Sequence, residues 1–482
     1  MKKQAGILMP VASLPNRFGS GDFGPDAYRF ADAIAKAGFS IWQLLPLNPL
    51  GYGNSPYQPY SSYAMDEIYI SIDLLEKEGL VSKHPDYRKR SKTIDYPKVR
   101  AYRERILREA FANFREDDDY HEFVSRSGWL EPYAVFRAFK QANDLRSWEE
   151  WPADMRDYPL KKNVDLAPYE EEIRYHRFLQ YMVDKQWDAL KAYVNKKGIE
   201  IMGDIPFYVG QDSADCWNGR PNFLLTKSGK PRFIAGVPPD YFSATGQRWG
   251  NPIYNWKYME KDGFSFWTER IGYSTQLFDI IRLDHFRAFD TYWKIPASCP
   301  TAQVGKWITA PGYKFFDHLF TTFPDLRIVA EDLGDMRPQV YKLRDYYNFP
   351  GMHIFQFEFD PNGENTMNTN SIVYTGTHDN ATIKGWVSSM SPEQKKETQR
   401  WFRRHKIAGA NLYEKMLRFV LNSEPKMAVI PMADWLYQGA SSTLNRPGTV
   451  GSPNWEWRLP DAAPFEEKLP QIKTMIRESG RQ

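Results

Sequence analysis

The chain of 482 residues contains only two cysteines, Cys216 and Cys299, which excludes a disulfide framework and a structural zinc cluster. No apolar run approaches the ~18 residues of a membrane-spanning helix, and the apolar stretch near the N-terminus is too short for a secretory signal. An excess of one charge is also missing, because 63 basic residues face 60 acidic ones, which argues against a nucleic-acid-binding surface. These absences predict a cytoplasmic globular protein that binds neither membranes nor nucleic acids.

Aromatic residues, in contrast, are abundant and make up 16% of the chain, with 16 Trp and 29 Tyr. Their rings combine a flat apolar face with a polar edge, which suits stacking on sugar rings as well as packing in a core. One aromatic cluster, at residues 246–256, includes Trp249. Its glycine and proline content is typical of a loop, and loops usually lie at the surface. We therefore expect Trp249 on a surface loop.

Short apolar runs typical of buried strands recur along the chain, and most are followed by helical patterns. One predicted helix starts at Pro25 and ends before Gly38, the favoured placement of proline and glycine at helix ends. Ser391 and Gln394 form a predicted capping box at the start of another helix. Eight strands alternating with helices predict an α/β fold of the (β/α)₈ TIM-barrel type. The eight runs are residues 6–9, 41–45, 199–202, 277–281, 327–330, 353–357, 372–375 and 427–430.

Two intervals between these runs are too long for simple crossovers. The first is charged and helical in pattern, as in residues 98–114 and 121–143, and the second is rich in glycine, proline and aromatic residues. Because structureless loops of this length are uncommon in compact domains, we expect subdomains at approximately residues 60–190 and 207–272, inserted into a single barrel spanning residues 1–482. About 50 residues follow the last strand, and they show no sign of a C-terminal β-domain.

A glycine-rich sequence at residues 19–24, GSGDFG, matches the pattern of a dinucleotide-binding turn. It starts about ten residues after the first strand, whereas phosphate binding needs a tight strand–turn–helix connection. The second strand also ends without an acidic residue for a ribose hydroxyl. We therefore expect these glycines to shape a loop and to bind no cofactor. The eight histidines include no pair or cluster with metal-ligand spacing, so no metal site is predicted.

Three acidic residues, Asp284, Glu331 and Asp379, stand shortly after predicted strands. The carboxyl-terminal ends of barrel strands meet at one face, so we expect these side chains to converge, although like charges repel in a low-dielectric cleft. Glycoside chemistry needs such a set, because one carboxylate attacks the anomeric carbon while a second group protonates the leaving oxygen. Arg282 should lie on the same face of its strand as Asp284, and we expect its guanidinium to keep Asp284 ionised.

The sequences around the acids, RLDHFR at 282–287, AEDLG at 330–334 and THDN at 377–380, resemble signatures of the amylomaltases, the bacterial 4-α-glucanotransferases. The resemblance extends over essentially the whole chain. It implies transfer of α-1,4-glucan segments to the 4-hydroxyl of a glucose or maltooligosaccharide by a retaining double displacement, with no metal or organic cofactor. It assigns the nucleophile to Asp284 and the general acid/base to Glu331, and it makes Asp379 the transition-state stabiliser.

The same resemblance implies a set of sugar-binding residues around the acids. Tyr57 looks like the aromatic platform of the donor site, and Trp249 is expected to stack on an acceptor ring. Two segments, residues 246–256 and 445–454, are similar to the family's loops over the site. The residues assigned to substrate binding are Tyr57, Asp204, Arg282, His378, Trp249 and Asn454.

Three carboxylates serve hydrolysis as well as transfer, because the outcome depends on whether water or a sugar hydroxyl attacks the intermediate. An α-amylase-like hydrolase on the same barrel is therefore one alternative, although such relatives often carry a calcium site and a C-terminal β-domain. A non-catalytic glucan-binding protein is the other, and such a protein would be expected to have lost at least one of the acids. Family resemblance favours the transferase.

Overall fold

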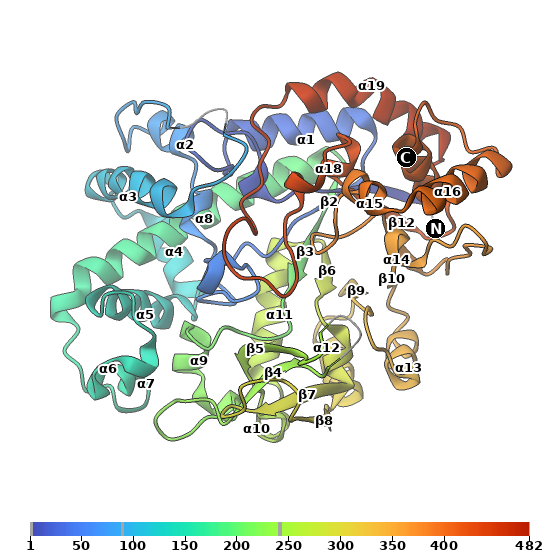
Figure 1. Cartoon of the computed structure of the whole chain (residues 1–482). Coiled ribbons are helices and arrows are strands. Elements are labelled where there is room, and N and C mark those ends of the chain that lie inside the picture. Colours follow the sequence, from blue (N-terminus) through green and yellow to red (C-terminus); the bar gives the residue numbers. More distant parts are fainter. Residues whose placement is uncertain (1–2, 88–90, 240–242, 482) are drawn as a thin grey trace.

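The computed structural model describes residues 3–87, 91–239 and 243–481 (Figure 1). Its centre is an eight-stranded parallel sheet ordered β10-β11-β12-β1-β2-β3-β6-β9. The N–H of Ala330, which ends β9, donates to the carbonyl of Pro350 just before β10 at 2.9 Å, so the two edges meet and the predicted TIM barrel is confirmed. The strands are β1 (Gln4–Leu8), β2 (Ile41–Gln43), β3 (Glu200–Ile205), β6 (Ile280–Leu283), β9 (Ile328–Ala330), β10 (Gly351–Ile354), β11 (Ser371–Tyr374) and β12 (Met427–Pro431).

Each of the eight predicted apolar runs overlaps one of these strands, but two runs extend into a neighbouring helix. The run at residues 277–281 begins in α11 (Ser265–Leu277), and β6 starts only at Ile280. The run at residues 353–357 continues past β10 into α14 (Phe355–Glu358). Apolar residues also cover the buried faces of helices, so a run alone does not show where its strand begins or ends.

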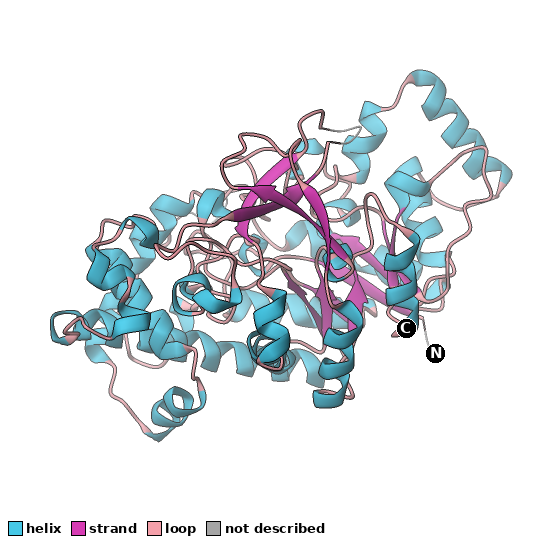
Figure 2. Ribbon diagram, turned by 90° about the horizontal axis from the view of Figure 1, so that it is seen from below, coloured by secondary structure: helices cyan, strands magenta, loops and turns pink. Residues whose placement is uncertain are grey.

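Helices cover the outside of the barrel, as Figures 1 and 2 show. The predicted ends of α1 (Pro25–Ala37) are confirmed, because Gly38 adopts the left-handed conformation with φ 91°. The capping box of Ser391 and Gln394 is present at the start of α16 (Pro392–Arg404). No helix in the described part of the chain is long and apolar enough to cross a membrane. The other covering helices include α12 (Gly312–Thr322), α13 (Pro338–Tyr346), α15 (Ile383–Ser389), α17 (Leu412–Asn422), α18 (Met432–Trp435) and α19 (Ala463–Glu478).

The segment between β2 and β3 is helical, and Figure 1 shows most of it gathered on one side of the barrel. The stretch 121–143 forms two helices and not one. The helical conformation is interrupted around Gly128, because glycine weakens a helix interior. Treating this segment as an inserted subdomain stays a prediction, and residues 88–90 lie outside the described part. Its helices are α2 (Ile72–Lys77), α3 (Tyr96–Asn113), α4 (Asp118–Arg126), α5 (Leu130–Ala142), α6 (Ala153–Arg156), α7 (Tyr158–Lys161) and α8 (Glu170–Lys196).

The segment between β3 and β6 contributes two strands to a second, antiparallel sheet ordered β5-β4-β7-β8, which Figure 1 shows below the barrel. The prediction of a loop at residues 246–256 is wrong, because this stretch forms β5 and the start of α10. β5 is an edge strand that pairs with β4 alone, and sheet edges tolerate proline, which has no N–H to donate. Residues 240–242 of this predicted insertion lie outside the described part. Between β3 and β6 lie α9 (Ala214–Asn218), β4 (Phe233–Val237), β5 (Gln247–Pro252) and α10 (Trp256–Lys261). The other two strands of the antiparallel sheet, β7 (Thr291–Pro296) and β8 (Lys306–Thr309), follow β6.

β1 lies between β2 and β12, so strands from distant parts of the sequence are neighbours in the barrel. Gln4 is in register with Met427. The buried guanidinium of Arg481 donates to the carbonyls of Ser423 and Pro425, at 2.9 and 2.8 Å, and so holds the segment that enters β12. After β12 the described residues form short helical elements and α19, and no further strand is found among them.

Candidate active site

Three adjacent strands, β3, β6 and β9, carry acidic residues at or just past one end of the barrel. Asp204 of β3 is in register with Arg282 of β6, Asp284 directly follows β6, and Glu331 directly follows β9. The N–H of Asp284 donates to the carbonyl of Ile205, and the N–H of Glu331 to that of Leu283, each at 3.1 Å. The strand register therefore brings the three acids together where parallel strands end.

Arg282 holds two of these carboxylates. Its Nη1 lies 2.6 Å from Oδ1 of Asp204 and 3.2 Å from Oδ1 of Asp284. The side chains of Arg282 and Asp204 are only 4% and 0% exposed, whereas that of Asp284 is 26% exposed. Removing either partner of a buried ion pair is strongly destabilising, so we expect Arg282 to stabilise the fold as well as to position Asp284.

Burial raises the pKa of both Asp284 and Glu331. The pKa of Glu331 lies well above its usual range, because burial and the neighbouring Asp284 carboxylate both favour the protonated form. Burial raises the pKa of Asp284 to about 7, against the opposing effect of Arg282. Arg282 lies beside Asp284 as expected, and its charge lowers the pKa of that carboxyl. Burial raises this pKa by more than Arg282 lowers it. Asp284 has the Arg282 guanidinium at 3.2 Å, which favours its charged form, so Glu331 is the carboxyl that more readily holds a proton.

His285 connects these two carboxylates through the backbone, because its N–H donates to Oε2 of Glu331. The residue has a positive φ of 49°, which is uncommon for a side chain with a Cβ and concentrates at functional sites. Burial lowers the pKa of its imidazole to about 4, so the ring is neutral. Its Nε2 is buried without a hydrogen-bond partner in the described part of the protein. The strained backbone therefore aims one N–H at Glu331, while the neutral ring packs against Tyr208 and Trp249.

A chain of contacts joins Asp379 to the same cluster. The Tyr57 hydroxyl donates to Oδ2 of Asp204 at 2.7 Å, and the Tyr57 ring stacks on His378 with a centroid distance of 5.2 Å and an interplanar angle of 17°. Nε2 of His378 lies 3.5 Å from Oδ1 of Asp379. Burial raises the pKa of Tyr57 well above its usual value and lowers that of His378. Tyr57 therefore keeps its proton, and His378 is a neutral ring.

Asp379 itself is held by a loop from another part of the barrel. Its side chain is 46% exposed, and Nδ2 of Asn445 donates to its Oδ1 at 2.6 Å. The N–H of Asn445 also donates to the carbonyl of His378 at 3.0 Å. Asn445 begins the segment 445–454, which follows β12, so this segment positions the loop that follows β11.

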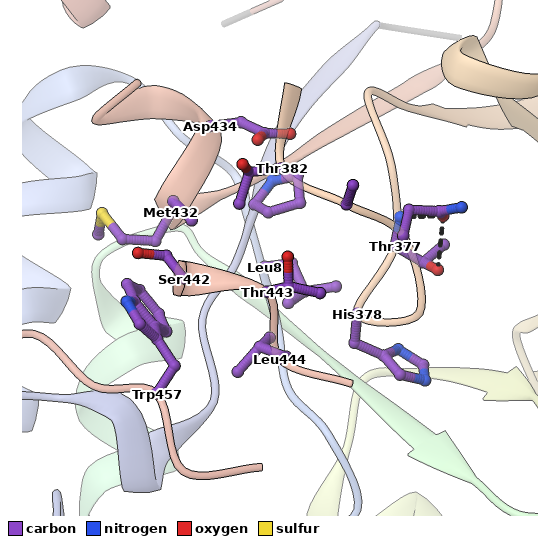
Figure 3. Close-up of a pocket in the computed structure, with 14 residues that line it drawn as sticks. Leu8, Thr377, His378, Thr382, Met432, Asp434, Ser442, Thr443, Leu444 and Trp457 are labelled. Carbon is purple, nitrogen blue, oxygen red and sulfur yellow. Dashed lines mark hydrogen bonds between the residues drawn. The ribbon is translucent and has the colours of Figure 1, made fainter. Parts of the chain in front are cut away.

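A small pocket lies behind these two loops (Figure 3). Asp434 of α18 is almost fully buried and accepts hydrogen bonds from the Thr375 hydroxyl, at 2.5 Å, and from the Ile383 N–H, at 2.7 Å. The two donors stand on either side of the loop that carries His378, whose ring points away from Asp434 in Figure 3. A cavity of about 20 Å³ accommodates a water molecule but no sugar ring. The pocket therefore binds no sugar, and the Asp434 side chain that lines it holds the two ends of the loop that carries His378.

The two remaining predicted sugar-binding residues differ in their access. Trp249 of β5 is partly exposed, and its ring lies edge-on to His285 with a centroid distance of 5.0 Å. Asn454 is buried, and its amide binds within its own loop, to the N–H of Arg446 at 3.0 Å and to the hydroxyl of Thr449 at 2.9 Å. Trp249 thus lies beside His285, the residue that follows Asp284, whereas a sugar contact by Asn454 requires its loop to rearrange.

Sequence reasoning did not single out three of the residues that hold the site, namely His285, Asn445 and Asp434. His285 stands inside the RLDHFR motif, but its strained backbone leaves no mark on the sequence. Asn445 lies in a polar loop without periodicity, so nothing indicates its contact with Asp379. The described residues contain no group of three or more His, Cys, Asp or Glu side chains arranged to hold a metal ion.

Comparisons with known proteins agree with this arrangement. A family model described as 4-alpha-glucanotransferase matches residues 9–463. The 4-alpha-glucanotransferase of Synechocystis sp. is 40% identical over 95% of this chain and 94% of the relative. The 4-alpha-glucanotransferase of Thermus thermophilus is 40% identical over 99% and 98%. The structure of the amylomaltase from Streptococcus agalactiae in complex with acarbose matches with a TM-score of 0.94 at 35% identity, over 100% of both chains. The chain therefore belongs to the family of the 4-alpha-glucanotransferases, the amylomaltases.

Proposed function

We propose that this glucanotransferase works by a retaining double displacement through a covalent glycosyl-enzyme. The observation that carries the proposal is the difference between two neighbouring carboxyls. Asp284 shares the Arg282 guanidinium and faces water, whereas Glu331 has a pKa well above its usual range. Neighbouring carboxyls with different surroundings take different roles in acid–base catalysis.

In the first step, a carboxylate oxygen of Asp284 forms a bond to C1 of the donor sugar. The bond between C1 and the leaving oxygen breaks, and Glu331 gives its proton to that oxygen. In the second step, the 4-hydroxyl of the acceptor gives its proton to Glu331 while its oxygen bonds to C1, and Asp284 leaves as a carboxylate. Each group thus returns to its starting state after one transfer.

The other predicted residues take supporting roles. Asp379, fixed by Asn445, is proposed to bind hydroxyls of the reacting sugar and to stabilise the charge that develops on its ring. The partly exposed ring of Tyr57, which stacks on the buried ring of His378, offers a flat face to the donor sugar, and Trp249 offers a partly exposed ring to the acceptor. We propose maltooligosaccharides as donors and acceptors, which is supported by the acarbose bound to the Streptococcus agalactiae relative.

The first test separates transfer from hydrolysis with maltotriose as the sole substrate. The α-amylase-like alternative is not favoured, because the relatives that match this chain over nearly its whole length are named 4-alpha-glucanotransferases. We therefore expect a ladder of longer maltooligosaccharides together with some free glucose, separated by chromatography. Accumulation of glucose and maltose without longer products would identify a hydrolase.

The second test looks for the covalent intermediate in the variant Glu331→Gln. A donor with a fluoride leaving group, such as α-maltotriosyl fluoride, needs no acid to leave, but the second step still needs the base. The glycosyl-enzyme should therefore accumulate and add one maltotriosyl mass to the intact protein. Peptide mapping should place the adduct on Asp284, and an adduct on another residue would refute the assignment.

A further inference from the structure

We propose that Gln58 is a positioning residue that sets the spacing between the donor side and the acceptor side of the active site. This inference rests on the proposed roles of Tyr57 and Trp249 and extends them. It assigns to Gln58 an influence on how often a sugar hydroxyl, and not water, receives the glycosyl group. Gln58 touches neither substrate nor the reacting acids in this proposal, and it acts through Trp249.

One side chain makes the connection. Nε2 of Gln58 donates to the backbone carbonyl of Trp249 at 2.8 Å and to Oδ1 of Asn251 at 3.1 Å. Both hydrogens of its amide group are thereby used, and both reach residues of β5 about 190 positions further along the chain. Tyr57, the neighbour of Gln58 in sequence, is anchored to Asp204 by its hydroxyl. A single glutamine therefore links the segment of the donor platform to the strand that carries Trp249.

The Gln58 end of this link is rigid. The N–H of Tyr60 donates to the carbonyl of Pro49 at 3.0 Å, and the N–H of Ala214 donates to the carbonyl of Tyr60 at 2.8 Å. The fit is so close that a Cβ added to Gly51 would lie 2.0 Å from the carbonyl oxygen of Gln58. Substitution of Gln58 should therefore leave Tyr57 and its loop in place.

The Trp249 end is held more weakly by its own sheet. β5 is an edge strand that pairs with β4 alone, and its register shifts between the pairs Ile234–Pro252 and Gly236–Arg248. Trp249 lies inside this irregular stretch and is followed by Gly250, which has a φ of 84° and open space where a Cβ would be. The sheet ladder thus leaves Trp249 without regular pairing, and Gln58 supplies a fixed contact for its backbone.

This arrangement matters for transfer because the acceptor must hold its 4-hydroxyl near C1 in competition with water. A typical hydrogen bond contributes about 0.5–1.5 kcal/mol to stability, which corresponds to about a two- to tenfold change in an equilibrium constant. Loss of the contact to Trp249 should weaken acceptor binding by that factor. The contacts of Asp284, Glu331 and Arg282 do not involve Gln58, so cleavage of the donor should be spared.

The test compares Gln58→Leu and Gln58→Glu with the control Gln211→Leu. Gln211 makes a similar contact, from its Nε2 to the carbonyl of Gly229 at 3.1 Å, but it touches neither Trp249 nor β5. Two readouts are measured for each protein: the KM for glucose as acceptor at a fixed saturating donor, and the ratio of new reducing ends to transfer products. The kcat at saturating acceptor and thermal unfolding report on the chemistry and the fold.

For Gln58→Leu we expect the acceptor KM to rise about fivefold and the hydrolysis-to-transfer ratio to rise about threefold, with kcat changed less than about twofold. Gln58→Glu should show the same split or a larger one, because its carboxylate would face the carbonyl of Trp249. Gln211→Leu should leave both readouts unchanged. Unchanged acceptor KM and product ratio in both Gln58 variants would overturn the proposal, as would an equal fall of kcat for donor and acceptor reactions.

Trp249→Ala separates failure of this inference from failure of the proposed function. A raised acceptor KM in Trp249→Ala, with no effect in the Gln58 variants, would refute the role of Gln58 alone. An unchanged acceptor KM in Trp249→Ala would refute the acceptor role of Trp249 and the inference with it. The double variant Gln58→Leu/Trp249→Ala should be no worse than Trp249→Ala, because Gln58 acts through that residue.

Discussion

The acids of this site are held in two different ways. Asp284 follows a barrel strand directly and shares a guanidinium with Asp204, whose side chain is fully buried. Asp379 stands four residues beyond Thr375, on a loop, and depends on Asn445 from another loop. The group proposed to form a covalent bond thus sits on the stiff framework, and the group proposed to stabilise charge sits on loops.

The acids at the strand ends are held by the backbone of the sheet, whereas Asp379 is held by side chains of loops. Strand register fixes Arg282, Asp284 and Glu331 with backbone hydrogen bonds that are shared by the whole sheet, so their geometry is as stable as the fold. The loop of Asp379 is fixed by a few side chains, chiefly Asn445 and Asp434. Changes at the strand ends should therefore affect both catalysis and folding, whereas changes in the loops should affect catalysis alone.

The largest expected effect is at the nucleophile. Asp284→Asn should lower kcat by about 10⁴-fold or more, because no covalent bond to C1 forms. Asp379→Asn should lower it by about 10²- to 10³-fold, because charge stabilisation is weakened while the nucleophile remains. Initial rates of maltotriose disproportionation measure both. Equal losses in the two variants would show that the assignment of roles is wrong.

Removal of the shared cation should have the next largest effect and should act on the fold. Arg282→Met leaves two carboxylates without a counter-ion in a buried place, which should lower the free energy of unfolding by about 3–5 kcal/mol in denaturant titrations. Arg327→Met is the matched control, because Arg327 also pairs with a carboxylate of β3, Glu200, but at an exposed position. In Arg327→Met, the free energy of unfolding should fall by less than about 1 kcal/mol. A similar loss in both variants would contradict the proposed difference between the sites.

A smaller effect is expected in the loop. Asn445→Ala removes the hydrogen bond to Asp379 and should lower kcat about tenfold, equivalent to about 1.4 kcal/mol. The melting temperature should remain close to that of the wild type, because the contact lies at the surface of the barrel. Asn445→Asp places a second carboxylate beside Asp379 and should be worse than Asn445→Ala. Wild-type kcat in Asn445→Ala would show that Asp379 needs no such support.

The smallest expected effect is a pH dependence of stability. The pKa of Glu331 is raised in the folded state, so its contribution to stability is fully present below the unfolded pKa and is lost as pH rises through the folded one. Glu331→Gln has no such loss, and its free energy of unfolding relative to the wild type should increase from pH 5 to pH 9 by about 1 kcal/mol or more. Denaturant titrations across this range provide the measurement. A difference that is constant with pH would contradict the raised pKa.

The sequence predicted the barrel and its acids because both follow from simple patterns. Buried parallel strands need continuous apolar runs, and an acid just beyond such a run must lie where neighbouring strands also end. Arg282 and Asp284 illustrate this, since a separation of two residues places both at the same end of β6. The roles of the acids came from the family resemblance, because spacing alone does not distinguish a nucleophile from a proton donor.

The contacts between loops could not be predicted in the same way. The strand β5 was not predicted, because Gly250 and Pro252 are typical of loops. They are tolerated here because β5 is an edge strand. Asn445 and Gln58 act through single side-chain hydrogen bonds to residues far away in the sequence, and no local pattern accompanies such bonds. The strength of burial at Asp284 was also not visible, because it depends on all the elements around the site.

The position of β1 between β2 and β12 has a consequence for synthesis of the protein. β12 is translated more than 400 residues after β1, as the pair Gln4–Met427 shows. At about 5–20 residues per second, the β1 edge waits roughly 20–80 s for its second neighbour. An unpaired strand edge invites association with other chains. Nascent chains on crowded ribosomes are therefore exposed to misassembly for most of translation, and yield in cells should respond to chaperone supply more than to the stability of the finished barrel.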